Sequence, residues 1–517
     1  MSDQAAQLSA MLASGINRRT FLAAGTGVAG SLLIPRSVLA DPAHVAANPT
    51  PLSAPRDGAR DISQEFAAFA AGMRYEDLPA DAVEAAKKSL LDTLGVMLAA
   101  SGVESATSPL IELLKETGGK EEATVFGENF RLPASAAAFV NGALAHSLDF
   151  DPQTPWGAHC DSSIVPTVLA LAELRGGCSG ADLITAIAVG QEVFIRLRLN
   201  VGWHMDWNLS TVVGCFSATC AGACLMNLNE TQTANAMGIV SMQSSGTMEL
   251  VFGVGSDLRG MYAGFCSQAC VTAVRLAQRG MTGISNLFEG EAGHFSVYFR
   301  GEYDRAKMLH ELGTKFSSGG MLYKYWPAVG NAHTYIHASL MLSCENNIDT
   351  KNIKEIVVYV GDFQQRMCTP LEVRCAPTTA IDAKFSLPFL VALALARRQV
   401  KVSDFSPESL SSPDVLALAK KVVPVVSADY NWKSKLPDGR VEIRMVDGKV
   451  YSQVGSNVPG SPEAPLTWDQ LTHKFYECGL VAKNPVSMDK SFQAAFIVKD
   501  LQRAEGVTDL LRLIQAA

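Results

Sequence analysis

The stretch NGALAHSLDFDPQTPWGAHCDSSIVPTVLALAE, residues 141–173, places Asp149, Asp151 and His159 within eleven positions between two apolar, Ala-rich segments. The Ala and Leu content of the flanks predicts helices, whereas the Pro and Gly residues between them predict an irregular loop. Loops held by rigid helices often carry catalytic groups. We therefore expect a candidate active site here. The alternative is that the carboxylates cap the next helix and the histidine is a core residue.

Helical periodicity of apolar residues dominates the chain from about residue 61 to 300, for example in SGADLITAIAVGQEVFIRLRL (179–199). The pattern changes after about residue 320. There IKEIVVYVG (353–361) predicts a buried strand, and VEIRMVDGKVYSQV (441–454) predicts a hairpin with an Asp-Gly turn. Between them, KFSLPFLVALALARR (384–398) predicts a helix packed on this small sheet. The sequence therefore predicts a mainly α protein with a smaller α+β domain.

The N-terminus has the pattern of a twin-arginine export signal. NRRTFL (17–22) precedes a moderately apolar run that ends near Ile34, and SVLA (37–40) offers small residues for cleavage after Ala40. The apolar run is too short and too rich in Gly to span a bilayer as a stable helix, a retained anchor being the alternative. We expect Tat-dependent export to the periplasm and no membrane attachment after cleavage.

Charge and cysteine content exclude several classes of protein. The net charge is −8, and removing the three Arg and one Asp of residues 1–40 makes it about −10. An acidic chain without basic runs is not expected to bind nucleic acid. The Cys220/Cys224 and Cys266/Cys270 pairs are spaced like metal ligands, but their small neighbours favour buried thiols in tight helix contacts. We expect no structural zinc and no iron–sulfur cluster.

The stretch around Asp149 also resembles the MmgE/PrpD family, because NGALAHSLDFDPQT is similar to the family pattern NGxxxHxLDFDDTH. Further similar stretches are LPADAVEAAKKSLLDTLGVMLAAS (78–101), VVGCFSATCAGACLMNLNETQTANAMGIVSMQSSG (212–246), KYWPAVGNAHTYIHASL (324–340), PTTAIDAKFSLPF (377–389) and GSPEAPLTWDQLTHKF (460–475). They are collinear over roughly four hundred residues.

The resemblance implies a large all-helical domain, an α+β lid domain and an active site in the cleft between them. It also implies a homodimer and a small polycarboxylate substrate. The expected segments are the signal peptide (1–40), a flexible leader (41–60), the helical domain (61–320), the lid domain (321–465) and C-terminal helices that return to the helical domain (466–517).

Several site residues follow from the resemblance. Lyase chemistry on a polycarboxylate needs a base or acid, cations for the carboxylates and a donor for the enolate-like intermediate. Asp149 matches the first Asp of the family's DFDD, and His159 stands at the His of its HPS. Lys324 in KYWP matches the Lys of KxYP, and His333 stands at the His that follows it. Lys384 in AKFSLP is a second-tier candidate, with a structural role as the alternative.

The chain departs from the family pattern at three places. Where the family has GTxxKPLH, GSDLRGMY (255–262) carries Arg259 for the Lys and Tyr262 for the His. Arginine keeps the charge but offers a planar fork, so carboxylate binding is expected there and proton donation is not. Where the family has HPTxVxG, Asn208 replaces the His. His204, four residues upstream, is expected to reach the same site.

A third departure places Pro-Gln-Thr (152–154) where the family has Asp-Thr, which shifts the hydroxyl by one residue. The expected catalytic residues are Asp149, His159, Lys324 and His204. The expected substrate-binding residues are Arg259, Thr154, Gln153, Asn208, Tyr262 and His333.

These features predict a metal-independent lyase, a dehydratase or decarboxylase, which acts without a cofactor on a small di- or tricarboxylic acid through a carboxylate-stabilised carbanion. An isomerase or epimerase would begin with the same proton transfer and is the nearest alternative. A non-catalytic periplasmic binding protein is a further alternative. The helical first half argues against it, because such receptors usually repeat βαβ patterns.

Overall fold

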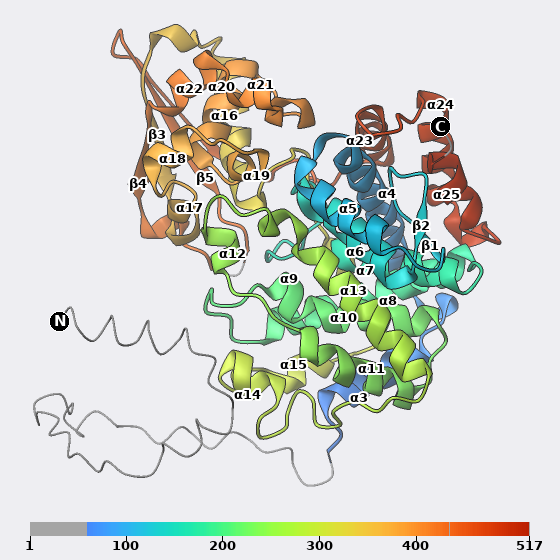
Figure 1. Cartoon of the computed structure of the whole chain (residues 1–517). Coiled ribbons are helices and arrows are strands. Elements are labelled where there is room, and N and C mark those ends of the chain that lie inside the picture. The colour runs from blue at the N-terminus through green and yellow to red at the C-terminus, as the bar shows by residue number, and fades with distance from the viewer. Residues whose placement is uncertain (1–58, 434, 516–517) are drawn as a thin grey trace, which may run out of the picture. The chain divides into compact units, whose positions relative to one another are not determined.

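The computed structural model describes residues 59–433 and 435–515 (Figure 1). The expected export signal and most of the expected leader lie outside these residues. Among the described residues, no single helix has both the length and the apolarity to cross a membrane. Two consecutive helical segments, Ala80–Val103 and Ser105–Thr117, meet both requirements only when taken together, and they are bent by 84° relative to each other.

The first part of the described chain is helical. Its α-helices are α3 (Ile62–Gly72), α4 (Ala80–Val103), α5 (Ser108–Thr117), α6 (Ala134–Ser147), α7 (Asp161–Leu174), α8 (Gly180–Asn200), α9 (Leu209–Val212), α10 (Gly214–Leu225), α11 (Glu230–Val240), α12 (Glu249–Phe252), α13 (Leu258–Gln278), α14 (His294–Phe299) and α15 (Arg305–Leu309). The two short strands β1 (Ala123–Thr124) and β2 (Arg131–Leu132) interrupt the helices and were not predicted.

Helices α6 and α13 approach each other closely because small residues line their contact. A Cβ atom added to Gly264 would lie 2.4 Å from the carbonyl oxygen of Phe139, and one added to Gly142 would lie 2.6 Å from Oγ of Ser267. Glycine at both positions therefore permits this contact. The contact fixes α6, whose last turn leads into the candidate active site.

The second part of the described chain surrounds one four-stranded sheet in the order β4-β3-β5-β6. Its strands are β3 (Ile353–Val360), β4 (Val422–Val426), β5 (Gly439–Met445) and β6 (Val450–Gly455). Its helices are α16 (His333–Glu345), α17 (Asp362–Arg366), α18 (Leu371–Cys375), α19 (Ala380–Lys384), α20 (Leu387–Arg397), α21 (Pro407–Leu410) and α22 (Pro413–Ala419).

The sheet confirms the predicted strand and hairpin. β5 and β6 pair antiparallel across the Asp447-Gly448 turn, where Gly448 has a φ of 88°. The edge strand β4, parallel to β3, was not predicted because Pro424 interrupts its apolar run, and an edge strand tolerates this proline. The expected packing of the 384–398 helix is wrong: α16 has the main contacts with β5 and β6, whereas α20 packs mainly on α16 and α22.

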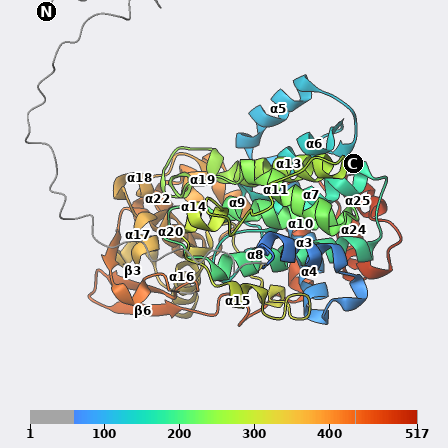
Figure 2. The ribbon, with the colours of Figure 1, turned by 90° about the horizontal axis from the view of Figure 1, so that it is seen from below.

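The C-terminal helices are α23 (Trp468–Leu480), α24 (Met488–Lys499) and α25 (Thr508–Gln515). They lie beside the first helices, with α23 along α4 (Figure 1). Their buried residues belong to the same apolar core as residues 62–323, whereas residues 326–458 build a second core. Figure 2 shows this separation from below, with β3 and β6 at one end and α24 and α25 at the other. The α+β part is therefore inserted into the helical part.

Candidate active site

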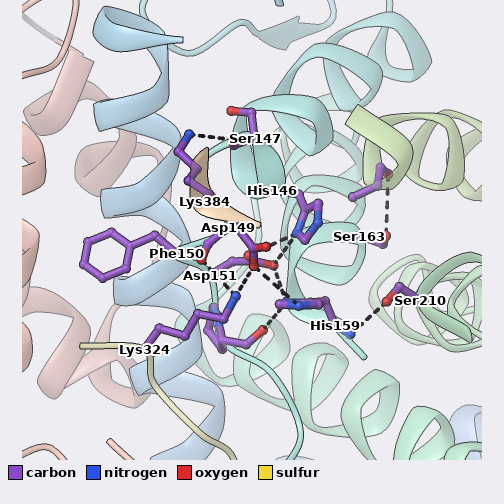
Figure 3. Close-up of polar contacts among 12 residues, drawn as sticks. His146, Ser147, Asp149, Phe150, Asp151, His159, Ser163, Ser210, Lys324 and Lys384 are labelled. Atoms are coloured by element: carbon purple, nitrogen blue, oxygen red, sulfur yellow. Dashed lines mark hydrogen bonds and ion pairs between the residues drawn. The ribbon is translucent and has the colours of Figure 1, made fainter. Parts of the chain in front are cut away.

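The last turn of α6 and the loop after it place four ionisable groups together (Figure 3). His146 lies in that turn and is buried. The chain reverses at Asp149, whose φ of 49° is in the left-handed region that Asp tolerates better than most residues. The backbone N–H of Asp149 donates to the carbonyl oxygen of His146 at 2.8 Å. This tight turn brings Asp149 and Asp151 beneath the imidazole of His146.

Asp151 lies between two histidines. Nδ1 of His146 is 3.1 Å from both of its carboxylate oxygens, and Nδ1 of His159 is 2.9 Å from Oδ2. The two imidazole rings have centroids 4.7 Å apart. The backbone N–H of His159 donates to Oγ of Ser210 at 3.0 Å (Figure 3). Asp151 therefore orients both rings, while Ser210 fixes the backbone beneath one of them.

Lys324 supplies the cation of this cluster. Its Nζ atom forms an ion pair with Asp149 and donates to the carbonyl oxygen of the same residue at 2.8 Å. Both side chains are buried, and Lys324 lies in the segment that leads into the α+β part. The ammonium therefore neutralises one of the two buried carboxylates and connects the two parts of the chain.

Lys474 of α23 joins the two segments that carry these residues. Its Nζ atom donates at 2.8 Å to the carbonyl oxygen of Phe150 and at 2.8 Å to that of Lys324. It also pairs with Asp92 of α4 at 2.7 Å. Burial raises the pKa of Asp92 to about 6, although Lys474 opposes this shift. Lys474 thus fixes the backbone of both loops without lying among the residues that line the cavity described below.

Burial and charge set the protonation states of the cluster. Burial lowers the pKa of His159, and the nearby Asp151 only partly offsets this effect. Burial alone would raise the pKa of Asp151, but the interactions of its carboxylate with His159 and His146 outweigh it and hold that pKa well below its usual range. Burial likewise opposes ionisation of Asp149, yet Lys324 and the histidines lower its pKa. At neutral pH, His159 is therefore neutral and both carboxylates are ionised.

The hydrogen bonds of His159 determine which ring nitrogen carries its proton. Nδ1 lies 3.1 Å from the carbonyl oxygen of Pro152 as well as 2.9 Å from Asp151. A carbonyl oxygen and an ionised carboxylate only accept hydrogen bonds, so the proton is on Nδ1. Nε2, which is 3.9 Å from Oδ1 of Asp149, is then unprotonated. His159 can therefore accept a proton at Nε2.

Tyr262 provides a proton donor that lines the same cavity as His159. Burial raises the pKa of its hydroxyl well above the usual value, so the hydroxyl stays protonated. Its ring lies 4.3 Å from that of His146, and its hydroxyl contacts Ser210. A neutral imidazole and a protonated phenol form the acid–base pair that proton-transfer chemistry requires.

These groups line a cavity with about 650 Å³ of space that no atom fills, part of it open to solvent. His146, Asp149, His159 and Tyr262 form its polar end. Most of the remaining wall is apolar or aromatic and includes Trp203, Met248, Val251, Phe363, Phe385 and Trp432. Large apolar pockets with a few convergent polar groups are typical of small-molecule sites.

Two groups of described residues have the ligand types and spacing to hold a metal ion. His146, Asp151 and His159 have ligand atoms within 4.8 Å of one another, and so do Cys215, Cys266 and Cys270 of α10 and α13. In the first group, Asp151 already accepts hydrogen bonds from both imidazoles. A metal would have to replace these bonds.

Five of the residues expected from the sequence lie on the cavity wall: Asp149, His159, Gln153, Asn208 and Tyr262. The backbone of Gln153 pairs with that of Leu322, in the segment that leads into the α+β part. The Asn208 side chain caps α9 by accepting from the N–H of Ser210 at 3.1 Å. Both residues therefore line the cavity, Gln153 from a loop held by its backbone and Asn208 from a loop held by its side chain.

The other expected residues are not among those that line the cavity. The Thr154 hydroxyl donates to the carbonyl oxygen of Gly157, and Arg259 packs on the ring of Phe385 at 4.4 Å. His204 is exposed and pairs with Glu302 at 2.7 Å on the surface.

His333 is buried against Trp326, and burial lowers its pKa to about 3. Lys384 pairs with Glu104 at 3.3 Å and donates at 3.2 Å to the carbonyl oxygen of Ser147 (Figure 3). Lys384 therefore links the α+β part to the end of α6.

The sequence interpretation did not nominate His146, Arg198 or Trp432, which all line the cavity. The His of NGxxxHxLDFDD and its spacing of five residues from Asp151 could have indicated His146. Trp203 and Trp432 come from distant segments yet pack edge to face with ring centroids 6.2 Å apart. No local pattern signals such a pair.

Two family models match the chain. The MmgE/PrpD N-terminal domain matches residues 64–306, and the MmgE/PrpD C-terminal domain matches residues 326–494. The chain is 25% identical to the cis-aconitate decarboxylase-like protein oryM of Aspergillus oryzae, over 88% of this chain and 97% of that protein. It is 23% identical to the cis-aconitate decarboxylase of Mus musculus, over 88% and 94%. It is 22% identical to the 2-methylcitrate dehydratase of Salmonella typhimurium, over 75% and 83%. With matches that extend over both parts of the fold, the chain belongs to the MmgE/PrpD family.

Proposed function

We propose that this protein is a lyase that removes water or carbon dioxide from a small di- or tricarboxylic acid through a carboxylate-stabilised carbanion, without a metal or cofactor. The observation that carries the proposal is the neutral imidazole of His159, whose Nδ1 is held by Asp151 and Pro152 and whose Nε2 is free to accept a proton. Relatives named cis-aconitate decarboxylase and 2-methylcitrate dehydratase support the reaction class.

In a dehydration, Nε2 of His159 removes the proton next to a substrate carboxylate, and the electron pair of the broken C–H bond is delocalised onto that carboxylate. The C–O bond to the neighbouring hydroxyl then breaks, Tyr262 donates its proton to the leaving oxygen, and a C=C bond and water form. The proton on His159 returns to Tyr262 through solvent. In a decarboxylation, the C–C bond to a carboxylate breaks, its electron pair stays on the carbon, and carbon dioxide leaves. Tyr262 then protonates the carbanion and recovers its own proton from solvent.

An epimerase is the second candidate, because His159 and Tyr262 both line the cavity and could exchange a proton at one carbon from two directions. Proton NMR in deuterated buffer separates the candidates. The purified protein would be incubated with citrate, methylcitrate, aconitate, malate, tartrate and aspartate-like acids. An unsaturated or decarboxylated product supports the lyase, and deuterium exchange without such a product supports the epimerase. If all acids return unchanged and one raises the melting temperature, the binding-protein alternative replaces the proposal.

We also propose export by the twin-arginine route and assembly as a homodimer. Support comes from the NRRTFL pattern for export and from the family resemblance for the dimer. Cell fractionation of a variant with Arg18→Lys and Arg19→Lys tests the first, since loss of the twin arginines should retain the protein in the cytoplasm. Light scattering of the purified protein tests the second, and a monomer mass would contradict it.

A further inference from the structure

Two arginines on helix α8 are almost equally buried but differ in their partners. Arg196 is 7% exposed and Arg198 is 8% exposed. The Arg196 guanidinium pairs with Glu192 at 2.6 Å and donates to several backbone carbonyl oxygens. Arg198 has no carboxylate within 4.0 Å among the described residues, and its one hydrogen bond goes to the carbonyl oxygen of Trp156. Arg196 is a fully paired structural residue, whereas Arg198 is a buried cation without a counter-ion.

The guanidinium of Arg198 still has unused hydrogen-bonding capacity. Its Nε atom is buried and has no hydrogen-bond partner within the described part of the chain. Burial lowers the pKa of Arg198 to about 10, so the group remains charged at neutral pH. Buried charges in proteins are normally paired, and an unpaired one at a cavity wall indicates that a ligand supplies the partner.

Arg198 is also part of the wall of the candidate active site. Its guanidinium lies 5.1 Å from the ring centroid of Trp203, which packs edge to face with Trp432. Among the lining residues, all of them in the described part of the chain, Arg198 is the only Arg or Lys. The carboxylate of Asp149, which also lines the cavity, is already paired with Lys324.

The wall around Arg198 restricts the rest of the ligand. Apart from the polar end with His146 and His159, the cavity is bounded mainly by aromatic and aliphatic side chains. A tricarboxylate would bring three negative charges to a wall with one permanent cation. A dicarboxylate can place one carboxylate beside the imidazoles and the other on Arg198, while an apolar substituent fills the aromatic wall.

We propose that Arg198 binds the second carboxylate of the substrate and that the substrate is a dicarboxylic acid with an apolar substituent. This inference rests on the proposed function, because the reacting carboxylate is assigned to the end of the cavity that holds His159. A planar guanidinium binds a carboxylate through two parallel N–H bonds, which an ammonium cannot reproduce. The aromatic wall contributes affinity by burying the apolar substituent.

The test measures binding by calorimetry with 2-benzylsuccinate, a dicarboxylate with an apolar substituent, and tricarballylate, a tricarboxylate without one. The wild-type protein should bind 2-benzylsuccinate more tightly. Arg198→Gln should weaken that binding by about tenfold or more, the usual effect of losing a charge-assisted hydrogen bond. Arg198→Lys should restore part of the affinity. Tighter binding of tricarballylate would overturn the substrate class, and Arg198→Gln within twofold of wild type would overturn the role of Arg198.

Arg196→Lys is the matched control, because Arg196 shares the helix and the burial of Arg198 but already has its partner. This variant should lower the melting temperature and leave the affinity for 2-benzylsuccinate unchanged. If Arg198 only supports the carbonyl of Trp156, Arg198→Lys should also lower the melting temperature without changing the affinity for 2-benzylsuccinate. That result would overturn the proposal. If Arg198→Gln does not fold, the affinity of Arg198→Lys still tests the role of Arg198, and the two wild-type affinities still test the substrate class.

The calorimetry also separates this inference from the proposed function, because binding needs no turnover. If 2-benzylsuccinate binds through Arg198 but no acid reacts or exchanges deuterium, the lyase proposal fails and the binding role of Arg198 stands. If a substrate turns over and Arg198→Gln leaves its KM unchanged, the role of Arg198 fails and the lyase proposal stands.

Discussion

Lys324 and Asp149 form an ion pair in which the side chains are only 0% and 2% exposed. One residue comes from the segment that opens the α+β part and the other from the turn after α6. Taking both charges out of water is unfavourable, so the pair stabilises the fold only as long as both members are present.

Replacing Lys324 with Met should therefore leave the buried carboxylate of Asp149 without a partner. The free energy of unfolding should fall by about 3–5 kcal/mol, as measured by chemical denaturation. The double variant Lys324→Met/Asp149→Asn should recover part of this stability but no activity. Equal stability of the single and double variants would contradict the ion-pair explanation.

Substitution His159→Gln should reduce kcat by about 10²–10⁴-fold, the usual contribution of a general acid or base, with little change in melting temperature. His204→Gln is the matched control, because His204 is exposed and pairs only with Glu302. It should leave steady-state kinetics unchanged. If both variants were fully active, His159 would not be the base.

The activity should depend on pH through His159. Because burial lowers the pKa of His159, its neutral form persists below the ordinary value of 6.5. The kcat/KM should therefore be constant around neutral pH and decrease only at a pH below 6.5. A kcat/KM that rises as pH falls through this range would show that the protonated imidazole is the reactive form.

Stability should also depend on pH through His294, whose pKa burial lowers to about 3. Because this value lies below 6.5, the unfolded chain binds the proton first as pH falls. The contribution of the neutral ring is complete above pH 6.5 and is lost between pH 6.5 and about 3. His294→Phe should remove this loss, so its unfolding free energy should gain on wild type by up to about 1.4 kcal/mol per pH unit below 6.5. Parallel stability curves for the two proteins would contradict the assignment.

Chelation tests metal independence. Dialysis against EDTA, followed by metal analysis and an activity assay, should leave turnover unchanged. Loss of activity that a divalent cation restores would instead assign His146, Asp151 and His159 as ligands, since their ligand atoms lie within 4.8 Å of one another.

The sequence predicts most of the helices because their apolar periodicity is local, and it predicts the β5–β6 hairpin because the Asp447-Gly448 turn is local as well. The sequence does not predict the strand β4, because Pro424 lacks the backbone N–H that a central strand needs. An edge strand tolerates this proline, and β4 lies at the edge of the sheet. Strand propensity alone cannot reveal that position.

The residues of the candidate site are likewise only partly predictable from the sequence. Asp149, Asp151 and His159 are visible because they occupy one loop, whereas Arg198 becomes notable only in the folded protein, because no carboxylate of the described residues pairs with it. His204 was expected to reach the cavity, but its loop turns to the surface, where Glu302 provides a nearby carboxylate. Charge pairing between distant segments is a property of the fold and leaves no spacing rule in the sequence.

Lys474 pairs with Asp92 and donates to the backbone of the loops at Phe150 and Lys324. These contacts join segments of the chain that are synthesised at different times. A ribosome releases α4 long before α23, so Asp92 and the two backbone carbonyls cannot contact Lys474 until α23 has been made. A truncated chain that stops before Trp468 would thus contain every residue assigned here to chemistry and still lack the group that fixes their loops. The group that fixes the loops of the candidate site therefore comes from a helix that is translated after all of the candidate catalytic residues.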